Sequence, residues 1–311
     1  MEMKEKAELV DPLVSIIVIT YNSAKYVLET LESAKAQTYQ NIELIVSDDC
    51  STDNTVEICR KWINENVERF VRTELVTAEK NTGIAPNCNR GLFAAKGEWV
   101  KFIAGDDILL PNCIADNINY VFLNKDAQVI FSISQLFKIV DNKRVMLYEQ
   151  PLDRQKIWFE KTSNEQHNEL LERNFVWTAA TSFISYQLLK SMNYFDTRFP
   201  YTEDYPMWLK LTKEGHKLHF FEKSTALYRQ AESITNNKDV WINKKYFQSL
   251  DMIFKILLTP ELKKINYDRY ICIKRNLLKK RVLINLFRNK KSISARMFNK
   301  LYDKLIPNNE L

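Results

Sequence analysis

The sequence of 311 residues is poor in several residue types, and each shortage excludes a class of protein. Only five glycines and eight prolines are present, too few for a collagen-like or low-complexity chain. The five cysteines form no C-x-x-C pair, which argues against a structural zinc site and favours a reducing cytosol. No run approaches the roughly 20 apolar residues that a membrane-spanning helix needs.

The rest of the composition is that of a large folded protein. Apolar residues make up 45% of the chain and charged residues 27%, enough to bury a core as one big domain or a domain with an appendage. Residues 1–12 are charged and contain no apolar segment of the kind that signal peptides have. We therefore expect a cytoplasmic protein that is soluble or peripheral to a membrane.

Short apolar runs alternate with helical patterns over the first half of the chain. Val14–Thr20 reads VSIIVIT, a β-branched run typical of a strand buried on both faces of a parallel sheet. The other expected strands are Ile42–Ser47, Glu74–Thr77, Glu98–Ala104 and Val129–Gln135. Helical patterns of ten to fifteen residues separate them, which indicates βαβ units with right-handed crossovers. The expected fold class is α/β, with a mostly parallel sheet flanked by helices.

Local signals also mark where helices begin and end. Asn54-x-x-Glu57 is a candidate capping box. Pro86 is expected to open the next helix and Gly97 to end it. A further helix is expected over Pro111–Leu123.

The pattern loosens after residue 136. Asp204–Glu214 is expected to be a helix, and Leu218–Phe221 and Ala226–Arg229 two strands. From Val240 onward the chain is helical and basic, with no strand signal. We place a domain boundary near residue 235, which divides the chain into a domain over 1–235 and a helical, basic extension over 236–311.

Two acid pairs follow the expected strands. Asp48–Asp49 comes after the second strand and Asp106–Asp107 after the fourth. Ligands of open parallel sheets bind outside the carboxyl ends of the strands. Carboxylates there would repel phosphate unless they bind a cation or accept hydrogen bonds, and adjacent carboxylates suit Mg²⁺ or Mn²⁺. Taken alone, Asp106–Asp107 is better explained as a cap of the following helix.

The order of several short motifs along the chain favours the metal-binding interpretation of Asp106–Asp107 over the helix cap. After VSIIVIT come Tyr21-Asn22, Asp48-Asp49, Asn81-x-Gly83, Asn89-x-Gly91 and Gly105-Asp106-Asp107. This series resembles the nucleotide-binding half of family 2 glycosyltransferases, whose fold is called GT-A. The resemblance covers roughly residues 12–110 as an ordered series and extends more weakly to about residue 235.

The resemblance implies roles for individual residues. Tyr21 would stack on or border the nucleotide base, and Asp49 would accept the N3–H of uracil. Asp106 and Asp107 would serve ribose and metal, with Asp107 as the metal contact. Many family members carry another Asp where this chain has Ala104, so fewer carboxylates are available here. The full set of expected nucleotide-binding residues is Thr20, Tyr21, Asn22, Asp49, Asn81, Gly83, Arg90, Asp106 and Arg229.

The second half would supply the catalytic base. Glu203-Asp204 opens the expected helix and looks like the family's Glu-Asp motif, in which the Asp removes a proton from the acceptor hydroxyl. Glu203 would orient Asp204 or meet the acceptor. In isolation, both residues are better read as acids that favour a helix N-terminus.

Two further residues have open alternatives. Arg229 lies in a segment that resembles the one closing over the diphosphate in the family, although a solvated Arg on an edge strand is an equal alternative. Trp177 lies where acceptor contacts are common in the family, and a core Trp is the alternative.

The last part of the chain carries a strong excess of positive charge. Between Lys263 and Lys304 there are fourteen Lys or Arg residues and two Asp residues. Leu278, Val282 and Leu286 share a helical face among them. Such a helix can lie on an anionic membrane, here the inner face of the plasma membrane, or it can be an ordinary helical cap with a solvated basic face. No nucleic-acid motif supports a third option.

The resulting expectation is an inverting, metal-dependent glycosyltransferase. It would use a UDP-sugar donor, Mg²⁺ or Mn²⁺, and a saccharide or lipid-linked saccharide acceptor in polysaccharide biosynthesis. The main alternative is a non-catalytic module that binds a saccharide or a partner on a degenerate transferase fold, and Ala104 favours it. A nucleotidyltransferase ranks last, and a dehydrogenase would need the G-x-G-x-x-G that this chain lacks.

Overall fold

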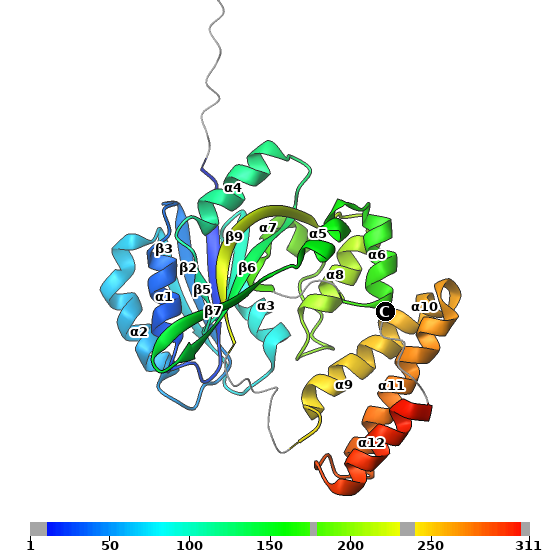
Figure 1. Ribbon diagram of the computed structural model, residues 1–311. Helices are drawn as coiled ribbons and strands as arrows, with labels where there is room; N and C mark the ends of the chain where they lie inside the picture. Colours follow the sequence, from blue (N-terminus) through cyan, green and yellow to red (C-terminus); the bar gives the residue numbers. More distant parts are fainter. Residues whose placement is uncertain (1–10, 175–178, 231–239, 306–311) are drawn as a thin grey trace, which may run out of the picture.

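The computed structural model describes residues 11–174, 179–230 and 240–305. Its centre is one twisted sheet in the order β3-β2-β1-β4-β8-β6-β9-β5, with β7 paired to β6 (Figure 1). The strands are β1 Val14–Thr20, β2 Ile42–Asp48, β3 Arg72–Thr77, β4 Trp99–Ala104, β5 Ile108–Leu109, β6 Val129–Val140, β7 Lys143–Gln150, β8 Phe183–Ser185 and β9 His219–Arg229. The helices before β9 are α1 Val27–Lys35, α2 Thr55–Asn66, α3 Ile84–Ala94, α4 Cys113–Leu123, α5 Asp153–Glu160, α6 Ser163–Glu172, α7 Tyr186–Ser191 and α8 Asp204–Lys213.

The sheet has a parallel half and a mixed half. β3, β2, β1 and β4 are all parallel, as the alternating pattern predicts. β8 then joins β4 and β6 in antiparallel pairs, while β6 and β9 are parallel. The expected α/β class is therefore confirmed, with a sheet that is mixed rather than parallel beyond β4.

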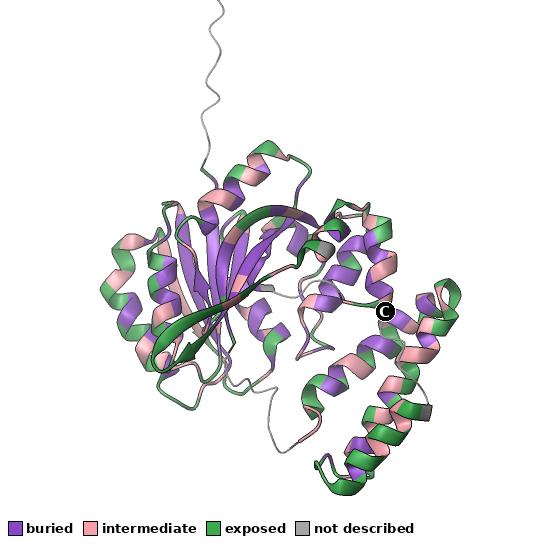
Figure 2. Ribbon diagram, in the orientation of Figure 1, coloured by how far each residue is buried: buried purple, intermediate pink, exposed green. Residues whose placement is uncertain are grey.

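Residues that alternate along the parallel strands enter two cores on opposite sides of the sheet. Ile16 of β1 packs with α1, α2 and α4, whereas the next residue, Ile17, packs with α3, α6 and α8. Because both faces are covered, these strands are mostly apolar, and the polar side chains of Ser15, Glu43 and Lys101 on them are buried as well. Figure 2 shows the resulting block of buried strands between the helices.

Several local expectations need correction. Asn54 precedes α2 but its side chain makes no cap hydrogen bond; instead Asp53 Oδ1 accepts from the N–H of Thr55 at 3.0 Å. Helix α3 begins at Ile84, before Pro86, and ends at Ala94, before Gly97.

The second half departs further from the expected elements. β6 runs on to Val140 and forms a hairpin with β7, which the sequence pattern missed because most β7 residues are exposed and its polar and apolar residues do not alternate. The two strands expected over Leu218–Phe221 and Ala226–Arg229 are one strand, β9.

The basic extension is helical, as expected. It consists of α9 Lys244–Ile253, a π-helical segment Phe254–Leu258, α10 Thr259–Ile265, α11 Tyr267–Asn285 and α12 Ile293–Leu305. Buried side chains from α9 to α11 join the same apolar cluster as α6 and α8, and Figure 1 shows these helices beyond α8, away from β1–β3. The expected boundary near residue 235 falls outside the described residues and stays a prediction. Within the described residues, no helix is both long and apolar enough to cross a bilayer.

Candidate active site

Three parallel strands end side by side at one edge of the sheet. Thr20 of β1 is in register with Asp48 of β2, and Ile19 with Ala104 of β4. The loops that follow these strands carry both acid pairs. The register therefore brings together residues that are far apart in the sequence, as expected for the carboxyl edge of a parallel sheet.

The first acid pair is fully occupied by hydrogen-bond donors. Asp48 accepts from the hydroxyl of Thr20 at 2.8 Å and the N–H of Ser51 at 2.8 Å. Asp49 Oδ2 accepts the N–H groups of Thr82 and Gly83 at 2.8 and 2.7 Å. Its Oδ1 accepts from the Thr82 hydroxyl at 2.6 Å and from Arg90 Nη2 at 3.3 Å. Since a carboxylate has about four acceptor positions, a uracil N–H would have to displace one of these donors.

The loop before α3 also contacts the chain that leads to the second acidic motif. Gly83 has φ +98°, and a Cβ there would lie 2.6 Å from the carbonyl oxygen of Pro200. Ala85 N–H donates to the same oxygen at 3.2 Å. The amide of Asn89 both donates to and accepts from the backbone of Phe195, at 2.8 and 3.0 Å. These hydrogen bonds thus hold the loop before α3 against the segment before Glu203.

Asp107 is buried and Asp106 is half-buried, and both have far fewer donors. Asp107 Oδ1 accepts the N–H of Arg229 at 2.8 Å, and its carbonyl oxygen accepts from the Thr30 hydroxyl at 2.7 Å. Burial raises the pKa of Asp106, and burial together with the charge of Asp106 raises the pKa of Asp107 well above its usual range. Two close carboxylates in such a place need a proton or a cation between them.

These two carboxylates fit a divalent metal that is shared with a substrate. Among the described residues, no group of three or more His, Cys, Asp or Glu side chains could hold a metal. Mg²⁺ is often bound by one or two carboxylates, with substrate phosphates and water completing its shell. Asp106 and Asp107 therefore suit a metal that arrives with a diphosphate better than a resident, all-protein metal centre.

The expected base lies at the start of α8. Glu203 precedes the helix and Asp204 is its first residue, with the N–H of Tyr205 donating to Asp204 Oδ1 at 2.7 Å. Both side chains are surrounded by protein yet keep partial contact with solvent. Burial and the neighbouring charge of Asp204 raise the pKa of Glu203 to about 8, and burial raises the pKa of Asp204 as well. The pair therefore retains a proton near neutral pH.

Electrostatic effects on neighbouring groups place the two donor-poor acid pairs around one region. Burial and the charges of Asp107, Asp106 and Asp204 together raise the pKa of Tyr228 to about 12. The pKa of the Cys88 thiol is raised first by burial and then by the charges of Glu203, Asp204 and Asp49. All three carboxylate sites thus lie within electrostatic reach of shared neighbours.

The basic extension also reaches this region. The pKa of Tyr246 on α9 is raised by burial and then by the charges of Asp204 and Glu203. Tyr246 of α9 therefore lies close to Glu203 and Asp204.

The remaining expected residues lie at this edge and differ in their exposure and in their hydrogen bonds. Tyr21 is 39% exposed directly after β1, as a base-stacking residue requires. Asn22 is engaged, because its Oδ1 accepts the N–H of Thr52 at 2.8 Å. Arg90 is held by Asp49 and by Asn87 Oδ1, the latter at 2.7 Å. Asn81 is exposed in the loop before α3. Trp177 lies outside the described residues.

Arg229 points inward rather than into solvent. Its Nε donates to the carbonyl oxygen of Asp106 at 2.7 Å, and its Nη2 pairs with Glu29. The solvated edge-strand arginine considered from the sequence is therefore wrong.

Sequence reasoning missed several residues that shape this edge. Asn87 bridges the strands, since its Oδ1 accepts from the Ser47 hydroxyl at 2.6 Å and its Nδ2 donates to the Thr20 carbonyl at 3.2 Å. On α1, Thr30 and Ser33 bind the backbone of Asp107 and Leu109. The spacing of these polar residues on the buried face of α1 was the available signal.

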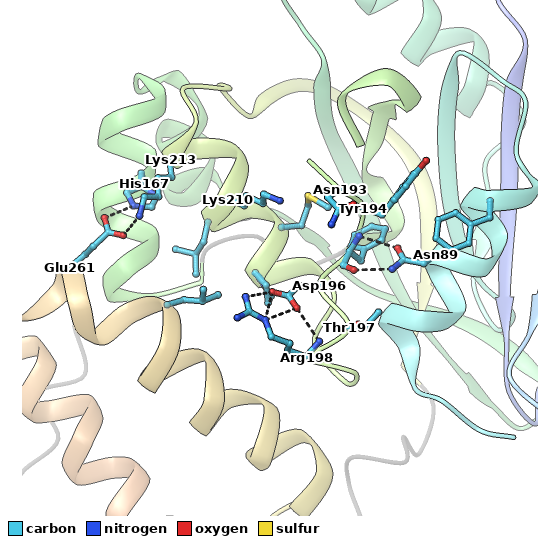
Figure 3. Close-up of a pocket in the computed structure, with 16 residues that line it drawn as sticks. Asn89, His167, Asn193, Tyr194, Asp196, Thr197, Arg198, Lys210, Lys213 and Glu261 are labelled. Carbon is cyan, nitrogen blue, oxygen red and sulfur yellow. Dashed lines mark hydrogen bonds and ion pairs between the residues drawn. The ribbon is translucent and has the colours of Figure 1, made fainter. Parts of the chain in front are cut away.

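A separate cavity of about 680 Å³ lies between α3, α8 and the first helices of the extension (Figure 3). Pro206 and Met207 line it, but the carboxylates described above do not. Of its charged groups, Arg198 pairs with Asp196 and Lys213 with Glu261, while Lys210 donates to the carbonyl oxygen of Met192. Asp106 and Asp107 form the better candidate site, because their pKa values stay raised although Arg229 lies nearby.

Comparison with known proteins agrees with this geometry. Residues 15–179 match the family described as Glycosyl transferase family 2. A relative from Rickettsia typhi, named uncharacterized glycosyltransferase RT0329, is 31% identical over 216 residues, which are 67% of this chain and 61% of the relative. The glycosyltransferase GlyG of Streptococcus pneumoniae is 38% identical over 118 residues, 38% of each chain. The chain thus spans less than two thirds of the length of these relatives.

Two solved structures share the fold. One is S. aureus TarS 1–349 in complex with UDP-GlcNAc, with a TM-score of 0.60 and 21% identity over 93% of this chain and 79% of that one. The other is the mannosyltransferase PcManGT from Pyrobaculum calidifontis in complex with GDP-Man and Mn²⁺, with a TM-score of 0.60 and 17% identity over 96% of this chain and 81% of that one.

Proposed function

Since this chain belongs to glycosyl transferase family 2, we propose that it transfers a sugar from a UDP-sugar to a hydroxyl group of a saccharide acceptor, with inversion at the anomeric carbon. The observation that carries the proposal is the presence of two donor-poor acid pairs around one region, Asp106–Asp107 and Glu203–Asp204. One pair suits a metal-bound diphosphate, and the other suits proton removal.

The proposed reaction is a direct displacement. Asp204 removes the proton of the hydroxyl group on the acceptor saccharide. The oxygen of that hydroxyl group bonds to the anomeric carbon of the donor sugar while the bond between this carbon and the diphosphate breaks. Glu203, whose raised pKa keeps it protonated near neutral pH, lets Asp204 carry the negative charge of the pair. A Mg²⁺ or Mn²⁺ ion held by Asp106 and Asp107 would offset the charge that develops on the leaving diphosphate.

A uridine donor is the finer part of the proposal. It is supported by the exposed Tyr21 beside the buried acceptor Asp49, and by the UDP-GlcNAc in the TarS structure. The GDP-Man of the archaeal neighbour marks the main competing donor class. Because the donors on Asp49 include the hydroxyl of Thr82 and the guanidinium of Arg90, a small side-chain movement would free an acceptor position for N3–H.

A thermal-shift screen of nucleotide sugars with and without Mn²⁺ tests this function. One UDP-sugar should raise the Tm in the presence of Mn²⁺, because a ligand that binds only the folded state stabilises it. Stabilisation by a GDP-sugar instead would overturn the uridine assignment. No shift with any nucleotide sugar, in a protein that unfolds cooperatively, would favour the non-catalytic binding module.

We also propose that the basic extension rests on an anionic membrane, where a lipid-linked saccharide of a polysaccharide pathway would be the acceptor. On α12, Ile293, Met297 and Leu301 recur at every fourth position and are 79%, 59% and 56% exposed. Helical residues four apart share a face, so these side chains form an apolar stripe among the Lys and Arg residues. Basic residues near an anionic surface contribute about 1 kcal/mol each.

Vesicle sedimentation tests the membrane contact. The protein should bind vesicles that contain phosphatidylglycerol, and it should bind pure phosphatidylcholine weakly. Met297→Asp should release it more than Ser294→Asp, which adds the same charge away from the stripe. Equal release by both variants would mean that charge alone matters and that the apolar stripe does not insert.

A further inference from the structure

Arg229 is enclosed by groups of the protein itself. Its side chain is only 3% exposed, and the guanidinium lies over the rings of Tyr26 and Phe137 at 4.4 and 4.6 Å. Its Nε donates to the carbonyl oxygen of Asp106 at 2.7 Å, while Nη2 pairs with Glu29. A guanidinium that is stacked on two rings and committed to two acceptors has little capacity left for a phosphate.

The same residue holds the second acid of the pair through its backbone. The N–H of Arg229 donates to Asp107 Oδ1 at 2.8 Å. β5 and β9 pair directly after Asp107, with Ile108 opposite Leu227, so this hydrogen bond continues the ladder. One residue therefore fixes the main chain of Asp106 and the carboxylate of Asp107.

Helix α1 completes the support from the other side. Thr30 donates to the carbonyl oxygen of Asp107 at 2.7 Å, and the adjacent Glu29 pairs with Arg229. Glu29 also pairs with Arg144 of β7. The carboxylate of Glu29 thus connects α1 with β7 and with β9 through its two arginine partners. The ion pairs of Glu29 are with these arginines, so its link to Asp106 and Asp107 runs through Arg229.

From these contacts we infer that Glu29 and Arg229 are positioning residues that hold Asp106 and Asp107 in the geometry a divalent cation requires. The inference rests on the proposed metal role of the pair. Arg229 acts by fixing the pair, and Glu29 acts by fixing Arg229. Partners that orient metal ligands typically change metal affinity by about 10–100-fold when they are replaced.

The test measures Mn²⁺ binding to the full chain by electron paramagnetic resonance, with UDP present, and UDP binding by calorimetry with and without Mn²⁺. Glu29→Gln keeps the shape of the side chain and removes its charge. Glu32→Gln is the matched control, because Glu32 lies one turn further along α1 and binds Trp62 Nε1 at 2.6 Å instead. Arg229→Lys keeps the charge but cannot bond Asp106 and Glu29 with one planar group.

We expect Glu29→Gln and Arg229→Lys to weaken Mn²⁺ binding by about tenfold, with metal-free UDP binding unchanged and Glu32→Gln like the wild type. Mn²⁺ binding that is unchanged in both variants would overturn the inference. So would loss of metal-free UDP binding in Arg229→Lys, since that result would make Arg229 a phosphate ligand. A wild-type protein that binds UDP but no Mn²⁺ would overturn the proposed metal site itself, and the inference with it.

Discussion

The acid pairs at the ends of β2 and β4 are the same dipeptide at the same edge of the sheet, yet their hydrogen-bond surroundings differ. Asp48 and Asp49 are surrounded by hydroxyl, amide and guanidinium donors. Asp106 and Asp107 have few donors, and their pKa values are raised by burial. An acid pair whose acceptors are filled organises its own loops, whereas a pair that lacks donors has charge left for a ligand.

Glu203–Asp204 belongs with the second kind. Its carboxylates accept little beyond the N–H of Tyr205, and burial raises both pKa values. Asp48–Asp49 is thus held by hydrogen bonds, whereas the other two pairs have raised pKa values, and each of the following experiments tests one side of this difference.

The largest effect is expected for Asp204→Asn. An amide cannot accept the acceptor's proton, so kcat should fall by about 10³-fold, while the Kd for UDP stays close to that of the wild type. Turnover with a UDP-sugar and titration of UDP measure the two quantities. Retained turnover would remove Asp204 from the role of base.

The two strand-end pairs should respond differently to substitution. Asp107→Ala should weaken Mn²⁺-dependent UDP binding by at least about tenfold. Asp48→Asn should leave the metal dependence unchanged and lower the free energy of unfolding by about 1–3 kcal/mol, because it disturbs buried hydrogen bonds. Calorimetry with Mn²⁺ or a chelator and urea unfolding compare the variants. Equal metal dependence in Asp107→Ala and wild type would contradict the difference between the pairs.

Gly83→Ala tests the loop that supplies donors to Asp49. At φ +98° and ψ 174° an alanine costs about 1–3 kcal/mol, and its Cβ would also lie 2.6 Å from the Pro200 carbonyl oxygen. Gly215→Ala is the matched control, because Gly215 has φ +90° but no atom within 4 Å of an added Cβ. Gly83→Ala should therefore lower the Tm more than Gly215→Ala, and it should weaken UDP binding as well. Similar Tm values for the two variants would show that the loop before α3 accommodates the added Cβ without loss of stability.

The smallest effect concerns pH. Burial and the charge of Asp204 raise the pKa of Glu203 from 4.5 to about 8, so the folded chain keeps a proton that the unfolded chain releases. The stability contributed by this proton is present at low pH and is lost as pH rises from about 4.5 to about 8. Glu203→Gln cannot titrate, so its Tm should fall less between pH 5 and pH 8 than that of the wild type.

Glu57→Gln, at an exposed position of α2, is the control for the pH experiment and should follow the wild type. A Glu203→Gln variant with the same pH dependence as the wild type would mean that Glu203 does not hold the proton.

Much of the parallel half could be predicted because its signals are local. β1 and β2 are short, mostly apolar runs, since helices cover both faces of the sheet. The mixed half gave weaker signals. β7 has an almost wholly exposed surface, and β8 is only three residues long; no apolar period can mark such strands.

The candidate site divides in the same way. The sequence by itself determined where the carboxylates stand, because an acid directly after a buried strand must emerge at the sheet's carboxyl edge. It could not determine what each carboxylate meets. Asp49 meets Gly83, and Asp107 meets Arg229, through contacts between segments that are distant along the chain.

Which pair has its acceptor positions occupied by hydrogen-bond donors, and which pair has positions free for a cation, depends on the tertiary structure. The reason is that a carboxylate's state depends on the donors and the water around it rather than on its neighbours in the sequence. Asp48–Asp49 and Asp106–Asp107 are identical as dipeptides. Their difference arises because α3 and its loop fold over the first pair with several hydrogen-bond donors, whereas β9 and α1 enclose the second pair, where the N–H of Arg229 donates to Asp107 and the Arg229 guanidinium offsets only part of the raised pKa of both acids.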